Sequence, residues 1–211
     1  MNRWMYRAQV KPGKQQLLQE ALRDVQESWK EALVKKGAET CSIFAFEHSL
    51  FIYVEAAFDS KDWSWPEEVH QWLEPWPDLA EEHTYQVFMP NVFYDGTVSE
   101  AQICRQQRES IERIGSIAVL KPDMVSSYVF YHYQMQEEMP GSFNQSYCIG
   151  LHGALLFSYY ELPAIKGASR VGKLATNHTP SNWHDVMAGH FTTGQGAEKS
   201  VWTKLDIWFA Y

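Results

Sequence analysis

The side chains best suited to chemistry lie in the segment SYVFYHYQ, residues 127–134, where a tyrosine and a histidine stand four positions apart. The preceding LKPDMVS is typical of a helix start. On a helix, Tyr128 and His132 share one face, one turn apart. An imidazole titrates near neutral pH and can accept or donate a proton, while a phenol can hold a hydroxyl group or share a proton relay. The pair predicts acid–base catalysis; the alternative is a core helix whose polar tips bind backbone groups.

The chain offers its own comparison for this pair, because each half has a Lys-Pro step before a predicted helix. Counted from that step, the positions of Tyr128 and His132 are taken in the first half by Leu18 and Leu22. Polar groups cost free energy to bury, and leucine would serve in a position that only packs. We interpret the second half as carrying the site and the first half as having lost it.

Other ring and polar side chains are candidates for binding a substrate. Trp183, in the segment SNWHDVM, offers a ring face on which the C–H groups of a sugar can stack, although core packing is the alternative. His184 follows it, Tyr131 lies on the flank of the helix described above, and His152 lies in a predicted hairpin. We predict all four as substrate-binding residues. No HxH or HExxH spacing supports a metal, and we predict none.

The elements that must position these residues follow from the residue patterns. In the first half, the patterns predict βαββαβ: a strand at Met5–Val10, a helix closed by Gly37, a hairpin turning at His48-Ser49, a short helix from Ser64 and a strand at 84–94. The second half predicts the same order, with a strand at 113–120, a helix at 121–139, a hairpin at 146–162, a short helix at 179–190 capped by Thr179 or Ser181, and a strand at 200–211.

Short identities support an internal duplication. LFIYVE at 50–55 matches LFSYYE at 156–161, Cys41 matches Cys148, and QWLEPW around Trp72 matches NWHDVM in the second half. These matches occur in the same order at nearly constant separation. We predict a first unit at 1–96, a linker at 97–110 and a second unit at 111–211. Because helices on one face of a sheet leave the other face bare, two such units can bury their bare faces together.

Composition narrows the classes of partner. The net charge of −8 argues against nucleic acid and against an anionic membrane surface. No run of 18 apolar residues occurs, and the first ten residues lack an apolar signal core, so we expect no membrane span.

The three cysteines are widely spaced without a CxxC, which argues against a disulfide framework or structural zinc and favours a reducing, cytoplasmic compartment. Aromatic residues make up 15% of the chain, which suggests dense packing, a ring-binding pocket or an aromatic interface.

The second half resembles the L-rhamnose mutarotase family in its helix signature, Pro122-Asp123 followed by Tyr128 and His132, and in the tryptophan at 183. The family has adjacent tryptophans there, whereas this chain has Trp-His. The resemblance implies an α+β fold of two ferredoxin-like βαββαβ units, packed as a pseudo-twofold dimeric α/β barrel within one chain. It also implies interconversion of sugar anomers without a cofactor, a small sugar as the partner, and an intramolecular pseudo-dimer that can pair further as a homodimer.

Two rival functions share this fold class. One is a monooxygenase of the same superfold, either cofactor-free or haem-linked, because a fold does not fix a function. The other is a non-catalytic protein that uses the pocket only to bind a small ligand.

Overall fold

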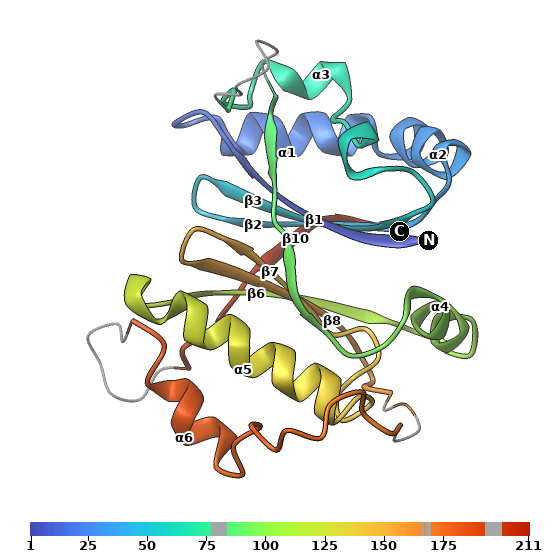
Figure 1. The fold of residues 1–211 in the computed structure, drawn as a ribbon. Helices are drawn as coiled ribbons and strands as arrows, with labels where there is room; N and C mark the ends of the chain where they lie inside the picture. Colours follow the sequence, from blue (N-terminus) through green and yellow to red (C-terminus); the bar gives the residue numbers. More distant parts are fainter. Residues whose placement is uncertain (77–83, 166, 168–169, 193–199) are drawn as a thin grey trace. The chain divides into compact units, whose positions relative to one another are not determined.

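The computed structural model describes residues 1–76, 84–165, 167, 170–192 and 200–211, apart from the side chain of Cys104. The protein is α+β, with two antiparallel sheets. It divides into two compact units (Figure 1), the first made of Met1–Pro90 with Leu205–Tyr211 and the second of Asn91–Lys204.

The first unit is a five-stranded sheet with helices over one face (Figure 1). In sheet order its strands are β10 (Asp206–Ala210), β2 (Ala38–Phe46), β3 (Ser49–Ala56), β1 (Asn2–Gln9) and β4 (Gln86–Phe88). Its helical segments are α1 (Gln15–Asp24), α2 (Gln26–Lys36), the 3₁₀ turn η1 (Ser60–Asp62) and α3 (Glu67–His70). The helix predicted as one is therefore two, and it ends as predicted because Gly37 adopts φ 96°, a left-handed conformation that glycine reaches without strain.

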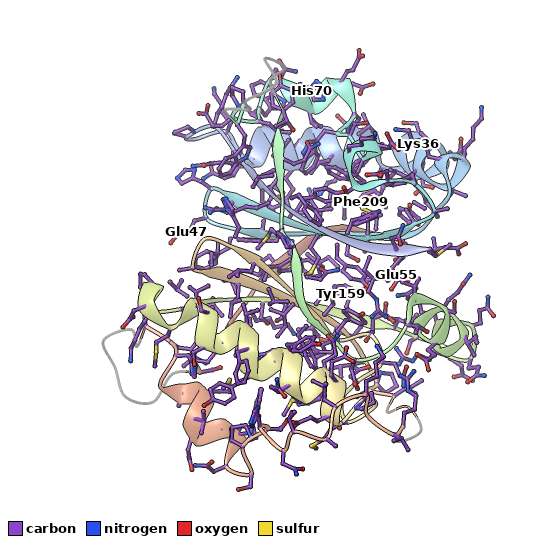
Figure 2. All side chains as sticks on the ribbon, in the orientation of Figure 1. Lys36, Glu47, Glu55, His70, Tyr159 and Phe209 are labelled. Atoms are coloured by element: carbon purple, nitrogen blue, oxygen red, sulfur yellow. The ribbon has the colours of Figure 1, made fainter. Side chains whose placement is uncertain are left out.

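The core of the first unit lies between this sheet and its helices. Leu18 and Leu22 of α1 are fully buried there, and Trp29 and Leu33 of α2 join them. Phe209 of β10 lies in the same layer (Figure 2), with its ring centroid 5.0 Å from that of Trp29.

The second unit repeats this plan (Figure 1). In sheet order its strands are β5 (Asn91–Tyr94), β7 (Cys148–His152), β8 (Leu155–Leu162), β6 (Glu112–Val119) and β9 (Thr203–Lys204). Its helical segments are α4 (Val98–Gln106), the 3₁₀ turn η2 (Pro122–Met124), α5 (Val125–Glu138) and α6 (Trp183–Ala188). The residue before α6 is Asn182, whose side chain makes no capping hydrogen bond, so the predicted caps at Thr179 or Ser181 are wrong.

The internal repeat is visible in both sheets. The order β2-β3-β1-β4 in the first corresponds strand for strand to β7-β8-β6-β9 in the second. The matched motifs also make the same contact: the hydroxyl of Tyr53 donates to the carboxylate of Glu55, and the hydroxyl of Tyr159 donates to the carboxylate of Glu161 at 2.9 Å.

The predicted boundary at residue 96 and the assignment of the whole C-terminus to the second unit are wrong. The segment predicted as one strand at 84–94 is two, because Pro90 has no N–H to continue the ladder, and β5 pairs with β7 of the second sheet. Likewise the last strand divides, so that β9 pairs with β6 while β10 pairs with β2 of the first sheet. Each sheet thus gains a fifth strand. This strand pairs with an edge strand that could otherwise pair with another chain.

The predicted linker at 97–110 is also wrong, because most of it is helix α4. A capping box begins the helix: the Thr97 hydroxyl accepts from the Glu100 N–H, and the Glu100 carboxylate accepts from the Thr97 N–H. Near the other end, Arg105 Nε donates to the buried carboxylate of Glu161 at 2.6 Å. This ion pair ties α4 to β8 and makes the segment part of the second unit.

Candidate active site

Helix α5 places the predicted catalytic pair in the interior of the second unit. Tyr128 is 1% exposed and His132 is 6% exposed, and their ring centroids lie 3.9 Å apart. Both residues line a cavity of about 340 Å³ within this unit. The i, i+4 spacing therefore brings a phenol and an imidazole to one cavity wall, as the sequence predicted.

The hydrogen bonding of His132 defines its tautomer. Its Nδ1 lies 2.9 Å from the backbone carbonyl oxygen of Tyr128. A carbonyl oxygen only accepts, so Nδ1 carries the proton and Nε2 of the neutral ring keeps its lone pair. Burial, with a smaller contribution from nearby His190, lowers the pKa of His132 from 6.5 to about 4 against the opposing effect of the Tyr128 carbonyl. His132 is therefore a neutral imidazole at physiological pH.

Tyr128 has the complementary state. Burial raises the pKa of its phenol well above 10, and the nearby Tyr147 adds to the rise. The hydroxyl keeps its proton at every pH at which the protein would be used, so it can donate a hydrogen bond. The cavity wall therefore offers a lone pair from His132 and a proton donor from Tyr128.

Helix α6 brings the two predicted binding residues Trp183 and His184 to the same cavity. The Trp183 ring meets the His132 ring edge to face, with centroids 4.9 Å apart. His184 is exposed and lies at the rim. One half-buried ring thus borders the imidazole of His132, and one exposed polar side chain lies beside it.

Tyr131 and His152 are not among the described residues that line the cavity. Tyr131 is half-buried and packs edge to face on His190, with centroids 5.9 Å apart. His152 ends strand β7 opposite Leu155, in the hairpin. Their absence from the described cavity lining gives no support to the predicted substrate-binding role.

Sequence reasoning missed most of the apolar wall. It is built by the rings and methionines Phe93, Met135, Phe143, Tyr147, Met187, Phe191 and Trp202. Helical spacing could have found Met135, three positions after His132, and Met187, four after Trp183. The other side chains come from β5 and from loops, where the sequence has no periodicity that predicts which way a side chain faces.

Two carboxylates hold the loops that shape this cavity. Asp95 accepts from the backbone N–H groups of Gly141 at 2.8 Å and Phe143 at 2.6 Å, which fixes the loop after α5. Glu138, at the end of α5, accepts from the Thr176 hydroxyl at 2.6 Å and from the Thr179 N–H at 2.9 Å. Chiefly because of the Thr176 hydroxyl, with Thr179 next, the pKa of Glu138 is lowered to about 2. The Asp95 bonds therefore hold the cavity-lining residue Phe143 in place, and the Glu138 bonds tie the segment before α6 to the end of α5.

No group of three histidine, cysteine or carboxylate side chains that could hold a metal ion occurs among the described residues. In the same part of the chain, no helix is long and apolar enough to cross a membrane.

Comparison with known proteins adds little. No family model matches this chain, and no curated protein does. A solved structure from Fusobacterium nucleatum subsp. nucleatum, of a protein named as a proposed monooxygenase, aligns over 99% of this chain and 92% of its own, with 10% identity and a TM-score of 0.42. A likeness at this level carries no argument about activity.

Proposed function

We propose that the second unit interconverts the anomers of a small sugar, in the manner of L-rhamnose mutarotase. One observation carries the proposal: a neutral imidazole with its lone pair on Nε2 and a protonated phenol line the same cavity of about 340 Å³. That volume lies at the small end of ligand pockets, which run from about 300 to 1,000 Å³, and suits one sugar ring.

The reaction needs no net proton change. Ring opening breaks the bond between the ring oxygen and C1, moves the proton of the anomeric hydroxyl to the ring oxygen, and leaves an aldehyde. His132 Nε2 accepts the first proton and returns it to the ring oxygen, so the imidazole ends neutral. After rotation about C1–C2, the ring closes on the other face of the aldehyde and the same transfers run in reverse.

The other residues would orient the sugar during these transfers. The Tyr128 hydroxyl donates a hydrogen bond to an oxygen that gains charge, where a fixed donor is worth more than water. The Trp183 ring packs against C–H groups, and His184 binds a hydroxyl at the rim. Because apolar side chains dominate the cavity wall, a deoxy sugar with a methyl group fits better than one with hydroxyls all round.

We also propose that the two units pack as a dimeric α/β barrel within one chain, an intramolecular pseudo-dimer. Two features support this arrangement: each sheet has its helices over one face, and each takes its fifth strand from a segment that the other repeat contributes.

The apolar cavity wall favours a second candidate, a monooxygenase acting on an aromatic ring. A neutral base next to rings such as Phe93 and Trp183 would suit removal of a proton from a phenolic substrate before oxygen attacks. Oxygen consumption with a hydroquinone, measured on colourless protein, would favour the cofactor-free kind, and a haem absorption band in purified protein would favour the haem-linked kind.

Exchange spectroscopy by NMR tests the main proposal. Magnetisation transfer between the α and β anomeric protons is measured for a panel of free sugars, with and without the protein. We expect at least one deoxy sugar to exchange faster with the wild-type protein and no faster than in buffer with His132→Ala. Faster exchange that is unchanged in His132→Ala would refute the assignment of the base.

A further inference from the structure

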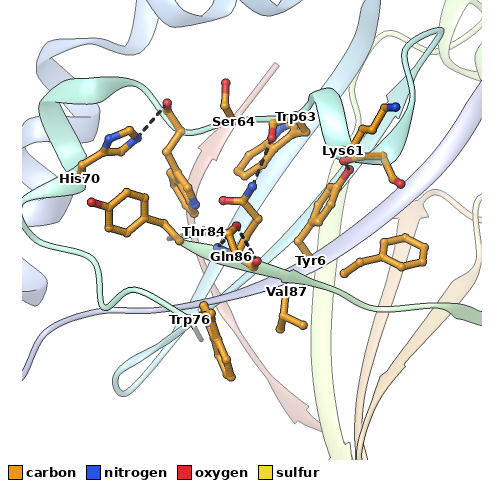
Figure 3. A pocket seen from close by; sticks show the side chains of 13 residues that line it. Tyr6, Lys61, Trp63, Ser64, His70, Trp76, Thr84, Gln86 and Val87 are labelled. Atoms are coloured by element: carbon orange, nitrogen blue, oxygen red, sulfur yellow. Dashed lines mark hydrogen bonds between the residues drawn. The ribbon is translucent and has the colours of Figure 1, made fainter. Parts of the chain in front are cut away.

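A second cavity, of about 660 Å³, lies wholly within the first unit (Figure 3). It lies between the edge of the sheet at β1 and β4 and the segment that runs from η1 to α3. Neither Leu18 nor Leu22 lines it, so it is not the counterpart of the cavity at Tyr128 and His132. The described residues that line it are Tyr6, Ser60, Lys61, Trp63, Ser64, Trp65, His70, Trp76, Thr84, Tyr85, Gln86, Val87 and Phe88.

The rings around this cavity are held in place by one another. Tyr6 stacks on Trp63 with centroids 5.1 Å apart and planes 19° apart (Figure 3), and Phe88 meets Tyr6 edge to face at 6.0 Å. Trp65 meets Trp63 edge to face at 5.1 Å. From the core side, Trp29 stacks on Trp65 at 5.8 Å. Tyr6, Trp63 and Trp65 are at most 3% exposed, so together they form a rigid base beneath the cavity.

A second pair of rings stands closer to the surface. His70 and Tyr85 stack at 4.4 Å with planes 27° apart, and both are half-buried. The ring of His70 also approaches the backbone carbonyl of Trp65, at 3.3 Å. This stack presents an aromatic platform that a ligand can reach from solvent.

The cavity also carries polar side chains that can bind hydroxyl groups, from Ser60, Lys61, Ser64, Thr84 and Gln86. The indole N–H groups of Trp63 and Trp65 do not belong to this set, because both nitrogens are shielded from solvent. The side-chain amide of Gln86 is fixed nearby by donating to the Trp63 carbonyl at 3.2 Å (Figure 3). A ligand that fills this cavity therefore needs polar groups, such as hydroxyls, as well as faces that stack on rings.

We propose that this cavity binds a carbohydrate of two or three sugar rings. Sugar rings carry C–H faces for the half-buried rings of Trp76 and Tyr85, and their hydroxyl groups can hydrogen-bond to polar side chains of the lining such as Lys61 and Gln86. The volume is nearly twice that of the second-unit cavity, so it takes more than one ring. No aspartate or glutamate is among the described residues that line it, and hydrolysis of a glycosidic bond needs two carboxylates.

The test uses the full-length protein with maltotriose, cellotriose and chitotriose as probes. Saturation-transfer NMR identifies the probe that binds, and tryptophan fluorescence gives its dissociation constant. For that probe, we expect Tyr85→Ala to weaken binding about tenfold, whereas Tyr85→Phe, which keeps the ring, binds as the wild type does. Phe88→Ala, at a residue 38% exposed, is a second variant for which the fold is expected to survive. Circular dichroism confirms the fold of each variant.

Two controls separate this cavity from other sites. Trp72→Phe changes a half-buried tryptophan of the same unit that does not line the cavity, and it should leave binding unchanged. His132→Ala should also leave it unchanged, which distinguishes this proposal from the proposed mutarotation. The proposal is overturned if no probe shows saturation transfer at millimolar concentration, if Tyr85→Ala and Phe88→Ala bind normally, if His132→Ala abolishes binding, or if only phenolic compounds bind.

Discussion

At the residue scale, the proposed activity of the second unit depends on one imidazole, that of His132, which burial keeps neutral. His132 is held by the Tyr128 carbonyl on one side of its ring and faces the cavity wall with Trp183 at 4.9 Å. Because burial penalises the charged form, the neutral form persists well below the pH at which a free histidine protonates.

Titration of His132 tests this directly. Its pKa in the folded protein is about 4, below the 6.5 of an ordinary histidine, so the unfolded chain binds more protons between these values. Stability therefore rises with pH across roughly pH 4 to 6.5, by at most about 3 kcal/mol from this residue. Nitrogen-15 NMR should show the proton on Nδ1 and a midpoint near 4. A midpoint near 6.5 would mean that the ring is exposed to solvent and the proposed site is wrong.

A second substitution tests the role of the Tyr128 hydroxyl by itself. Tyr128→Phe removes one hydroxyl and keeps the ring that packs, tilted by 31°, against His132. A single hydrogen bond made in the transition state is worth about 1.4 kcal/mol, so we expect anomer exchange to slow by about tenfold with the fold intact. The exchange rate and a thermal melt measure the two effects. Exchange at the wild-type rate would leave Tyr128 with a packing role only.

At the element scale, the helices and hairpins were predictable because their signals are local. The hairpin turn lies at Glu47-His48, one residue before the predicted His48-Ser49, and both it and the glycine that ends α2 lie next to the residues they organise. The periodicity of α5 was enough to place Tyr128 and His132 on one buried face. The segment at 97–110 was wrongly predicted to be a linker. The buried Glu161, with which its Arg105 pairs, lies far along the chain, and no local pattern reveals that contact.

The ion pair between Arg105 and Glu161 can be used to test whether helix α4 is anchored to β8. Arg105→Met removes one cation from the buried carboxylate of Glu161, which Arg108 also approaches at 3.4 Å. Breaking a buried ion pair usually costs about 3 to 5 kcal/mol, so we expect a loss near the lower value, since Arg108 remains. The matched control is Lys204→Met, whose ion pair with Glu112 is exposed and should cost under about 1 kcal/mol. Equal losses in urea unfolding would show that α4 is not anchored through Glu161.

At the scale of the whole molecule, the division of the last strand was not predictable. The segment at 200–211 has one continuous strand pattern, yet β9 belongs to one sheet and β10 to the other. Which sheet edge a strand joins depends on which edge strand lacks a hydrogen-bonding partner. That in turn depends on residues far apart in the sequence. For the same reason the loop residues Phe143 and Tyr147 of the second-unit cavity had no signal in the sequence.

The strand β10 gives a test of the two-unit division. Phe209→Ala removes a ring that packs on Trp29 and should lower stability by about 3 kcal/mol. Ile207→Ala, at a residue of the same strand that is 46% exposed, should change it by less than about 0.5 kcal/mol. Hydrogen exchange should speed up in the amides of β2 and not in those of β7. Equal loss of protection in both strands would contradict the assignment of β10 to the first unit.

The central claim is that His132 transfers protons for a sugar held in the second-unit cavity. Its most direct test is the rate of α to β anomer exchange of a deoxy sugar, measured by NMR for the wild-type protein and for His132→Ala at equal concentration. We predict that the wild type accelerates exchange and that the loss of the imidazole slows it by about a hundredfold or more while the protein stays folded. The same acceleration by both proteins, or none by either across the panel of sugars, would contradict the claim.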